Sequence, residues 1–332
     1  MGCITPVGNS VPEFWDNLKA GVCGIDTITE FPVDGLAVKI GGKVRNFNPE
    51  DYDVPKPFLR KQDPFAVYGL AAAWQAMQES GLKAGENIDN FRLAVNLSSG
   101  EGGFETIYRE CVKMHDDPAG TWVSPSFIPT MIPNIAAGQI ALKFQAFGPC
   151  MNISTACATS THAIGEAYRL IKHGYADAVI SGGTDHCTIP IGLAGFANCR
   201  ALTRAEDPKY ASLPFNLNRG GFVMADGAAA VILEEYEHAK ARGAHIYAEI
   251  NGYGATCDAY HSTAPRPDGT TQAECIKMAL RETGFDPEKD TVYLNAHGTG
   301  TLLNDRSETN AIKLAFGDYA RSLHISSTKS MH

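Results

Sequence analysis

The sequence predicts an α/β protein in which helices alternate with buried, mostly parallel strands. One observation is a set of short, almost uninterrupted apolar runs such as 177–183, which are typical of strands buried on both faces. Another is apolar residues at helical spacing between those runs. A third is the glycine that follows several helical segments, as Gly81 and Gly174 do. With 332 residues, the chain can form one large domain or two fused ones.

The first part of the chain, residues 1–237, is expected to contain most of these elements. A helix at 11–20 is amphipathic, and a longer one begins after Pro64 and stops near Gly81. The other elements expected in this part are a strand at 92–97, a glycine-rich turn at 98–103, a helix at 134–144, a short strand before Cys157, a helix from there to Gly174, and strands at 177–183 and 228–233.

A charged helix at 235–242, which ends at Gly243, marks the expected boundary with the second part, residues 238–332. Beyond it, the same signals predict strands at 246–252, 292–295 and 324–327, and helices at 271–283 and 306–316. The loops at 256–269 and 296–304 lie between these elements. Each part therefore combines helices with buried strands.

The composition excludes several classes of protein. A net charge of −9 disfavours broad affinity for nucleic acid or for an anionic membrane surface, and no apolar run is long enough to span a bilayer. The N-terminus lacks the basic and apolar regions of a signal peptide. Nine scattered cysteines without a Cys-x-x-Cys pair indicate reduced thiols in the cytoplasm, most of them as core residues, and give no zinc site.

Cys157 lies at the expected turn between a strand and a helix. The N-terminus of a helix carries partial positive charge and free N–H groups, which favour a thiolate and can hold a developing oxyanion. The alternative is a buried cysteine that acts as a small hydrophobe. The Ala, Thr and Ser residues around this turn favour a nucleophile instead.

His297 follows an expected strand and begins a loop rich in glycine and threonine, a place that ligand-binding and catalytic residues favour in parallel sheets. It lies 140 positions after Cys157, so only folding can bring the two together. The alternative is a loop histidine without a chemical role. For Lys329 and Glu308, residue type and position alone favour solvated charges.

Four motifs occur together and in order: 155–160 (Thr-Ala-Cys-Ala-Thr-Ser), 234–243 (Glu-Glu-Tyr-Glu-His-Ala-Lys-Ala-Arg-Gly), 295–301 (Asn-Ala-His-Gly-Thr-Gly-Thr) and 326–331 (Ser-Ser-Thr-Lys-Ser-Met). With them the chain resembles, over essentially its whole length, the elongating β-ketoacyl-[acyl-carrier-protein] synthases of fatty acid biosynthesis. The resemblance implies the thiolase fold, with two similar α/β halves in stacked layers of helices and sheets. It also implies a homodimer.

The resemblance implies a decarboxylative Claisen condensation, an acyltransferase reaction. Cys157 would carry the acyl chain, and His297 would stabilise the enolate that malonyl-carrier leaves on losing carbon dioxide. Other residues matched to the family's site are Lys329, its supporting acid Glu308, Thr299 and Thr301 along the pantetheine arm, and Phe196 at the substrate. No metal or nucleotide is implied, because phosphopantetheine of the acyl carrier protein holds the substrates.

An acidic carrier protein requires locally concentrated positive charge on this acidic chain. The residues that match the family's docking surface are Lys56, Arg60, Lys61, Arg200 and Arg204. Scattered, solvated charge is the alternative, but the two local clusters favour docking.

The chain departs from the family pattern in three places. The pattern continues beyond both ends, so we expect further residues there, and His332 lies two positions too early for the second catalytic histidine. Glu101 stands where an apolar residue usually borders the acyl pocket. It must point to solvent, find a partner or shorten the pocket. Gly220 and Ala225 replace an acid and a glycine in the loop near the site.

Three alternatives remain open. The first is a ketosynthase of polyketide assembly, which shares the fold and the chemistry. The second is a non-catalytic partner subunit of the chain-length-factor type, although such subunits usually lack the cysteine that this chain has at position 157. The third is a Cys-His hydrolase, for which an orienting acid motif is missing.

Overall fold

The structure is a computed structural model that describes residues 1–59, 61–286 and 289–331. The chain folds into two compact units, each built from separate segments. The first unit contains Met1–Val22, Gly42–Gly192 and Ala225–Tyr247, and the second contains Cys23–Gly41, Leu193–Met224 and the chain from Ala248 onward.

The first unit is organised around a four-stranded sheet with the strand order β1-β6-β5-β4. Its strands are β1 (Gly2–Ile4), β4 (Leu93–Ser98), β5 (Ala178–Asp185) and β6 (Gly227–Glu234). Its helices are α1 (Val11–Ala20), α2 (Lys56–Leu59), α3 (Pro64–Ser80), α4 (Phe104–Asp116), α5 (Phe127–Met131), α6 (Ile135–Phe144), α7 (Thr159–Lys172) and α9 (Tyr236–Ala241). The helix α8 (Pro190–Asn198) begins in this unit and ends in the second.

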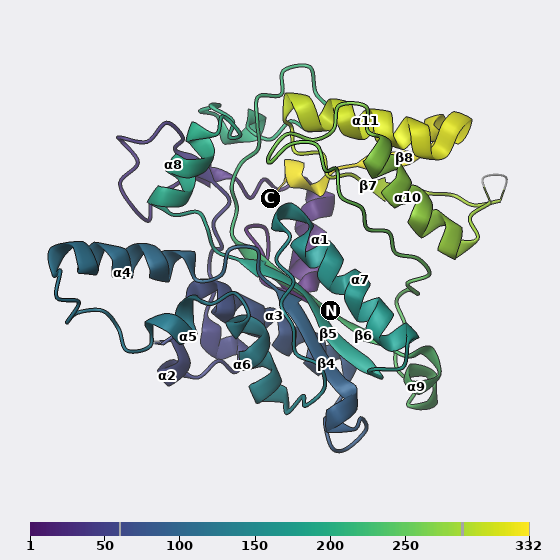
Figure 1. Cartoon of the computed structure of the whole chain (residues 1–332), viewed down its shortest axis with the longest axis horizontal. Coiled ribbons are helices and arrows are strands. Elements are labelled where there is room, and N and C mark those ends of the chain that lie inside the picture. Colours follow the sequence, from purple (N-terminus) through teal and green to yellow (C-terminus); the bar gives the residue numbers. More distant parts are fainter. Residues whose placement is uncertain (60, 287–288, 332) are drawn as a thin grey trace. The chain divides into compact units, whose positions relative to one another are not determined.

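Helices cover both faces of this sheet. Leu97 and Ile180 face one side, where they pack with α3 and α6 in a core that includes Leu70. Val179 faces the opposite side and packs with small residues of α7 such as Ala167, because successive side chains of a strand alternate between its faces. Figure 1 shows α7 lying across the sheet of β4, β5 and β6.

Local sequence signals account for the longest helix, α3. The Asp63 side chain accepts a hydrogen bond from the Phe65 N–H at 3.4 Å, and Pro64 occupies the first turn. Gly81 ends the helix with φ 67°, a left-handed conformation that glycine adopts without a Cβ penalty. The expected start after Pro64 and end near Gly81 are both confirmed.

The expectation of mostly parallel strands is wrong for this sheet. β4 and β5 are parallel, but β6 is antiparallel to both of its neighbours, β5 and β1. The chain leaves β5 at Asp185 and re-enters the sheet at Gly227, which pairs with Asp185. The long connection between them returns to the end of the sheet that it left, without crossing to the other end. The two strands therefore run in opposite directions.

The second unit contains two small sheets. In one, β2 (Asp26–Thr27) pairs antiparallel with β3 (Ile40–Gly41), and in the other β7 (Tyr293–Asn295) pairs in parallel with β8 (His324–Ser326). The helices α10 (Thr270–Thr283) and α11 (Leu302–Phe316) pack against each other. Figure 1 shows β7 and β8 beside these two helices.

Several elements differ from the expectation. No strand forms at 246–252 or at 151–155, all of which are described residues, although Cys150 makes a single bridge to Val95. Ile246, Tyr247 and Ile250 are exposed, so this segment does not form the buried strand that its apolar residues predicted. α11 begins at Leu302, earlier than residue 306, because Thr301 caps it. The elements that were not predicted from the sequence are β1, β2, β3, α2, α4, α5 and α8.

The cysteines are less buried than expected. Only Cys3 and Cys187 are fully buried among the nine, all of which are described and unpaired. The other seven are exposed or partly exposed, so the expectation that most are core residues is wrong. Across the described residues, no helix combines the length and the apolar character that a bilayer span requires.

Candidate active site

The Cys157 turn lies in the first unit, directly before α7. A short 3-10 turn, Ala156–Ala158, joins the preceding extended segment to the helix, so Cys157 lies at the expected helix N-terminus. Its side chain is exposed. The residue before it, Ala156, has φ 51°, which is an uncommon backbone conformation for a residue with a Cβ.

Hydroxyl groups hold this turn in place. The Thr155 N–H donates to Thr159 Oγ1 at 2.9 Å, which joins the two sides of Cys157. The His162 Nδ1 lies 2.8 Å from Thr155 Oγ1. These contacts are local in sequence, and they explain why a run of Thr and Ser residues surrounds the cysteine.

The second unit places His297 directly after β7 and supports its loop with a carboxylate of α11. Glu308 accepts hydrogen bonds from the backbone N–H groups of His297, at 2.7 Å, and of Gly298, at 2.8 Å. Gly298 has φ 43°, and an added Cβ would lie 2.5 Å from the Cβ of Ser327. This glycine is therefore required both by its backbone conformation and by the space around it.

The Lys329 segment lies beside the same loop. Lys329 belongs to the 3-10 turn Thr328–Ser330, which follows β8. The Thr328 N–H donates to Asn295 Oδ1 at 3.2 Å, which ties the end of β8 to the end of β7. Removal of water from around the His297 ring lowers its pKa, and the charge of Lys329 lowers this pKa further, whereas Glu308 and Asp305 act in the opposite direction.

The two threonines matched to the pantetheine arm lie in the same loop. Thr299 Oγ1 is 3.0 Å from Thr301 Oγ1, and Thr301 also accepts from the Asn304 N–H at 3.3 Å as the N-cap of α11. The second unit thus brings Glu308 to the His297 loop, with Lys329 near enough to affect the pKa of His297, and the catalytic roles of all three stay predictions. Cys157 belongs to the other unit, so its meeting with His297 stays a prediction.

Asp305, which the sequence analysis did not single out, fixes the neighbouring loop. Its buried carboxylate accepts from the N–H groups of Phe215, at 2.6 Å, and of Gly300, at 3.2 Å, and Arg219 lies 3.4 Å from it. The sequence feature that could have identified Asp305 is its place as an acidic residue in the first turn of a helix.

Asp185, at the end of β5, was also missed. It accepts from the Ser99 hydroxyl at 2.6 Å and from the backbone N–H groups of Gly100 and Glu101, each at 3.2 Å. The sequence feature that could have identified Asp185 is its place as a carboxylate at the end of an apolar strand. Glu101 itself is exposed, and its charge adds to the effect of burial in raising the pKa of Cys187.

The remaining predicted site residues are spread over both units. Phe196 lies in α8, with its ring 5.7 Å from that of Phe222. Lys56 and Lys61 are exposed in the first unit, and Lys56 forms an ion pair with Glu50 at 2.8 Å. Arg60 and His332 lie outside the described residues.

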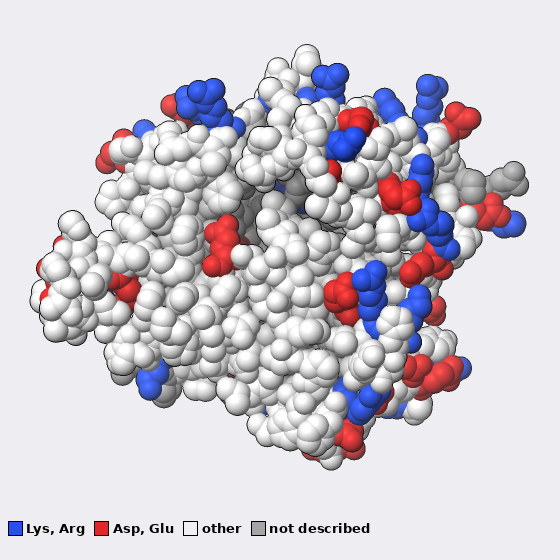
Figure 2. All heavy atoms as spheres, in the orientation of Figure 1, with Lys and Arg blue, Asp and Glu red and all other residues white. Residues whose placement is uncertain are grey.

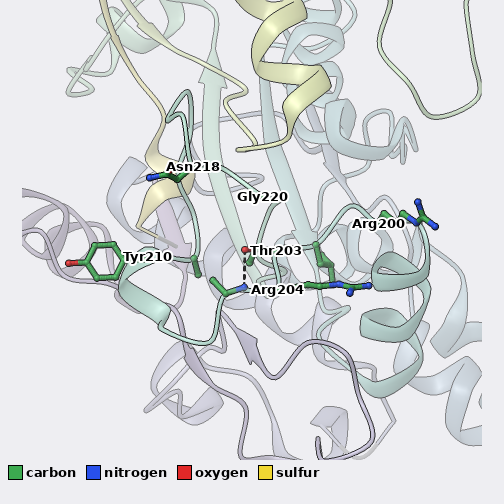
Figure 3. Close-up of a pocket in the computed structure, with 9 residues that line it drawn as sticks. Arg200, Thr203, Arg204, Tyr210, Asn218 and Gly220 are labelled. Atoms are coloured by element: carbon green, nitrogen blue, oxygen red, sulfur yellow. Dashed lines mark hydrogen bonds between the residues drawn. The ribbon is translucent and has the colours of Figure 1, made fainter.

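Arg200 and Arg204 line an open pocket of about 650 Å³ in the second unit. Figure 3 shows Arg200 and Tyr210 at opposite ends of this pocket, with Thr203 and Gly220 between them. The nine described residues that line it include two arginines and no acid, so the lining carries positive charge. On the face drawn in Figure 2, by contrast, basic and acidic side chains lie beside one another.

Comparison with known proteins gives matches along the whole chain. The family described as β-ketoacyl synthase, N-terminal domain, matches residues 1–239, and the β-ketoacyl synthase C-terminal domain matches residues 247–332. The 3-oxoacyl-[acyl-carrier-protein] synthase 2 of Staphylococcus aureus is 44% identical over 331 residues, which cover 100% of this chain and 81% of the relative. The protein of the same name in Synechocystis is 42% identical and is covered to 79%.

Solved structures of ketosynthases have the same fold. A type II polyketide ketosynthase, in complex with its acyl-carrier protein and bound to the hexaketide, superimposes with a TM-score of 0.89 at 32% identity, over 99% of this chain and 79% of that one. A β-ketoacyl synthase from Burkholderia phymatum gives a TM-score of 0.84 at 30% identity, over 95% of this chain and 76% of that one. The expected thiolase-like α/β fold is therefore confirmed.

Proposed function

The chain belongs to the β-ketoacyl synthase family, and we propose that it condenses malonyl units with an acyl chain held on Cys157. It is an acyltransferase, a 3-oxoacyl-[acyl-carrier-protein] synthase of fatty acid elongation. The alternative of a non-catalytic partner subunit is set aside for that reason. The observation that carries the assignment of Cys157 is its exposed position at the N-terminus of α7.

The first half of the reaction transfers the acyl chain to the enzyme. The Cys157 sulfur attacks the thioester carbonyl of an acyl-carrier, and the carrier thiol leaves with a proton. In this proposal the backbone N–H of Cys157 donates to the tetrahedral oxyanion. The chain is then held as a thioester on the protein.

The second half forms the new carbon–carbon bond. The bond between the malonyl carboxylate and C2 breaks, carbon dioxide leaves, and the electron pair moves into a thioester enolate. His297 donates a hydrogen bond to the enolate oxygen, and Lys329 adds positive charge nearby. C2 then attacks the acyl carbonyl, the bond to Cys157 breaks, and a 3-oxoacyl chain two carbons longer stays on the carrier.

The lowered pKa of His297 supports this role. A ring that is neutral near pH 7 donates from one nitrogen without contributing a full charge. The N–H groups of His297 and Gly298 donate to Glu308, so neither is available to a substrate carbonyl, whereas the ring of His297 is not used in these contacts. Glu308 then acts by fixing the backbone on which the ring is carried.

The partner is an acyl carrier protein, whose phosphopantetheine arm holds both substrates in this proposal. The pocket with Arg200 and Arg204 would receive part of that acidic carrier, and Lys61 offers a further exposed cation. We also expect a homodimer in the cytoplasm that requires no metal or nucleotide for the chemistry and binds no nucleic acid.

A labelling and turnover experiment tests the assignment. A short pulse of iodoacetamide, followed by mass mapping, should modify Cys157 first and abolish condensation. The Cys157→Ala variant should lose at least about 10³-fold in condensation rate, whereas Cys199→Ala, which removes another exposed cysteine, should keep the wild-type rate.

Release of labelled carbon dioxide from malonyl-carrier distinguishes a synthase from a hydrolase. The wild-type protein should release it and form a 3-oxoacyl product. An enzyme that hydrolyses acyl-carrier without releasing carbon dioxide, or a Cys157→Ala variant with wild-type condensation, would contradict the proposal.

A further inference from the structure

Asp185 anchors the loop that follows β4. Its Oδ1 accepts from the Ser99 hydroxyl at 2.6 Å and from the Glu101 N–H at 3.2 Å, and its Oδ2 accepts from the Gly100 N–H at 3.2 Å. Ser99 is fully buried, and its hydroxyl also accepts from the Gly102 N–H at 2.8 Å. A single carboxylate thus fixes the path of the whole 99–102 loop.

The 99–102 loop in turn holds the segment that leads to the nucleophile. The Ser99 carbonyl accepts from Ser154 Oγ at 2.8 Å and from Asn152 Nδ2 at 3.3 Å, and the Ser99 N–H donates to Asn152 Oδ1 at 2.7 Å. The segment before Cys157 forms no strand. The side chains of Asn152 and Ser154 instead make the hydrogen bonds to the Ser99 backbone that a neighbouring strand would have made.

The loop also lies close to the turn itself, as the space around Gly100 shows. A Cβ added to Gly100 would lie 3.6 Å from the Ala156 carbonyl oxygen and 3.5 Å from Thr159 Oγ1. Ala156, with φ 51°, is the strained residue directly before the nucleophile. Such backbone conformations are strained and persist only where the surroundings hold them. The 99–102 loop lies where that support is needed.

We propose that Asp185 is a positioning residue for the nucleophile: through Ser99 and its contacts with Asn152 and Ser154, it holds the Cys157 turn in the geometry that acyl transfer requires. This inference rests on the function proposed for Cys157. Asp185 lies at the end of β5 and acts through backbone and side-chain contacts, without touching the acyl chain.

An aspartate suits this place better than its amide. Both oxygens of Asp185 accept hydrogen bonds, and the donors approach from two sides. An asparagine has an oxygen on only one side, and its NH₂ group would face an N–H or O–H group on the other. Asp185→Asn therefore keeps the shape of the side chain but loosens one side of the loop.

The first test compares Asp185→Asn with Asp177→Asn. Asp177 precedes β5 at its opposite end, where it pairs with Arg92, so its replacement removes a carboxylate near the same strand without affecting the loop. We expect kcat for condensation to fall about 10- to 100-fold in Asp185→Asn. The KM for malonyl-carrier should stay within about twofold, and alkylation of Cys157 should slow along with kcat. Asp177→Asn should match the wild type in all three.

A second variant covers the case in which Asp185→Asn fails to fold. Ser99→Ala removes the shortest contact to Asp185 and adds no bulk, so it should lower kcat in the same direction but by less. A wild-type kcat and alkylation rate in whichever of the two variants folds would overturn the inference. If wild-type Cys157 were not acylated at all, the proposed function would fail instead, so the two failures can be told apart.

Discussion

The Cys157 turn and the His297 loop are held in place by different kinds of side chain. Each joins an extended segment to a helix, and each must be held still for chemistry. Around Cys157 the supporting contacts come from hydroxyls and an amide, with the carboxylate of Asp185 one step removed. Around His297 the carboxylate of Glu308 binds the backbone N–H groups directly.

The difference follows from the charge that each region must handle. In the proposed reaction a thiolate and an oxyanion develop at Cys157, so a carboxylate in direct contact would oppose the reaction and take up N–H groups that the oxyanion needs. His297 acts through its ring, so the N–H groups of its loop are available to an acid. A carboxylate therefore contacts the backbone of the histidine loop directly, whereas Asp185 acts on the Cys157 segment through Ser99.

Replacement of Glu308 by Gln is expected to have the largest effect on this arrangement. The amide can accept from only one of the two N–H groups, so the His297 ring loses its fixed position. We expect condensation and release of carbon dioxide to fall about 10- to 100-fold, with acylation of Cys157 unchanged. Steady-state rates and single-turnover acylation measure the two halves separately.

Glu274→Gln is the matched control for this variant. Glu274 lies on α10 of the same unit and pairs with the exposed Arg281, so its loss should leave both halves of the reaction unchanged. A Glu308→Gln variant that lost acylation and decarboxylation equally would contradict the separation of roles between the two regions.

His186 should make the stability of the first unit depend on pH, whereas the pH effect expected in the second unit is on the reaction rate. This buried ring lies 2.8 Å from Glu105 and 3.0 Å from Asp226, and Lys43 lies 2.6 Å from Asp226. Burial opposes the charge on the ring, but the contacts with Asp226 and Glu105 outweigh it and raise the pKa of His186 to about 9. Burial raises the pKa of the nearby Asp63, and the charge of His186 acts against that rise.

A group with a raised pKa stabilises the fold below its unfolded pKa, here 6.5, and loses that contribution as pH rises through about 9. We expect the wild type to lose roughly 2–3 kcal/mol of this stability between pH 6.5 and pH 9.5. His186→Gln should lack this part of the loss. Urea unfolding of both proteins at the two pH values measures it, and parallel curves for wild type and variant would contradict the prediction.

Lys329→Gln should give the smallest effect on the comparison, a change in pH dependence. Because the Lys329 charge lowers the pKa of His297, its removal raises that pKa. The ring then becomes protonated at higher pH, so the acid limb of the pH–rate profile for release of carbon dioxide moves to higher pH. The quantity to measure is the pH at which the acid limb reaches half of its maximum, because the maximum rate also reflects other roles of Lys329.

Lys313→Gln is the control for this shift, because Lys313 is an exposed residue of α11 without an assigned role. Its profile should coincide with that of the wild type. An acid limb that does not move in Lys329→Gln would show that the two groups are not coupled.

Local signals explain what could be predicted. The start and end of α3 follow from Asp63, Pro64 and Gly81, which act within one turn of the positions they define. The position of Cys157 before α7 follows equally from its neighbours. The antiparallel direction of β6 could not be predicted, because it depends on where the chain from 186 to 226 returns.

Contacts that support the site were also beyond local signals. Asp185 and Ser99 are separated by 86 positions, and nothing in either segment specifies the other. The absence of strands at 246–252 and before Cys157 has the same origin, since a strand needs a partner as well as a suitable sequence.

The sequence by itself determined the residue types that perform the chemistry, the helix ends, and the family, because these depend on short motifs and local capping. The tertiary structure decided which acids support which loop, how the central sheet is directed, and which thiols are exposed. These properties arise from contacts between distant segments, whose free energies depend on geometry and burial.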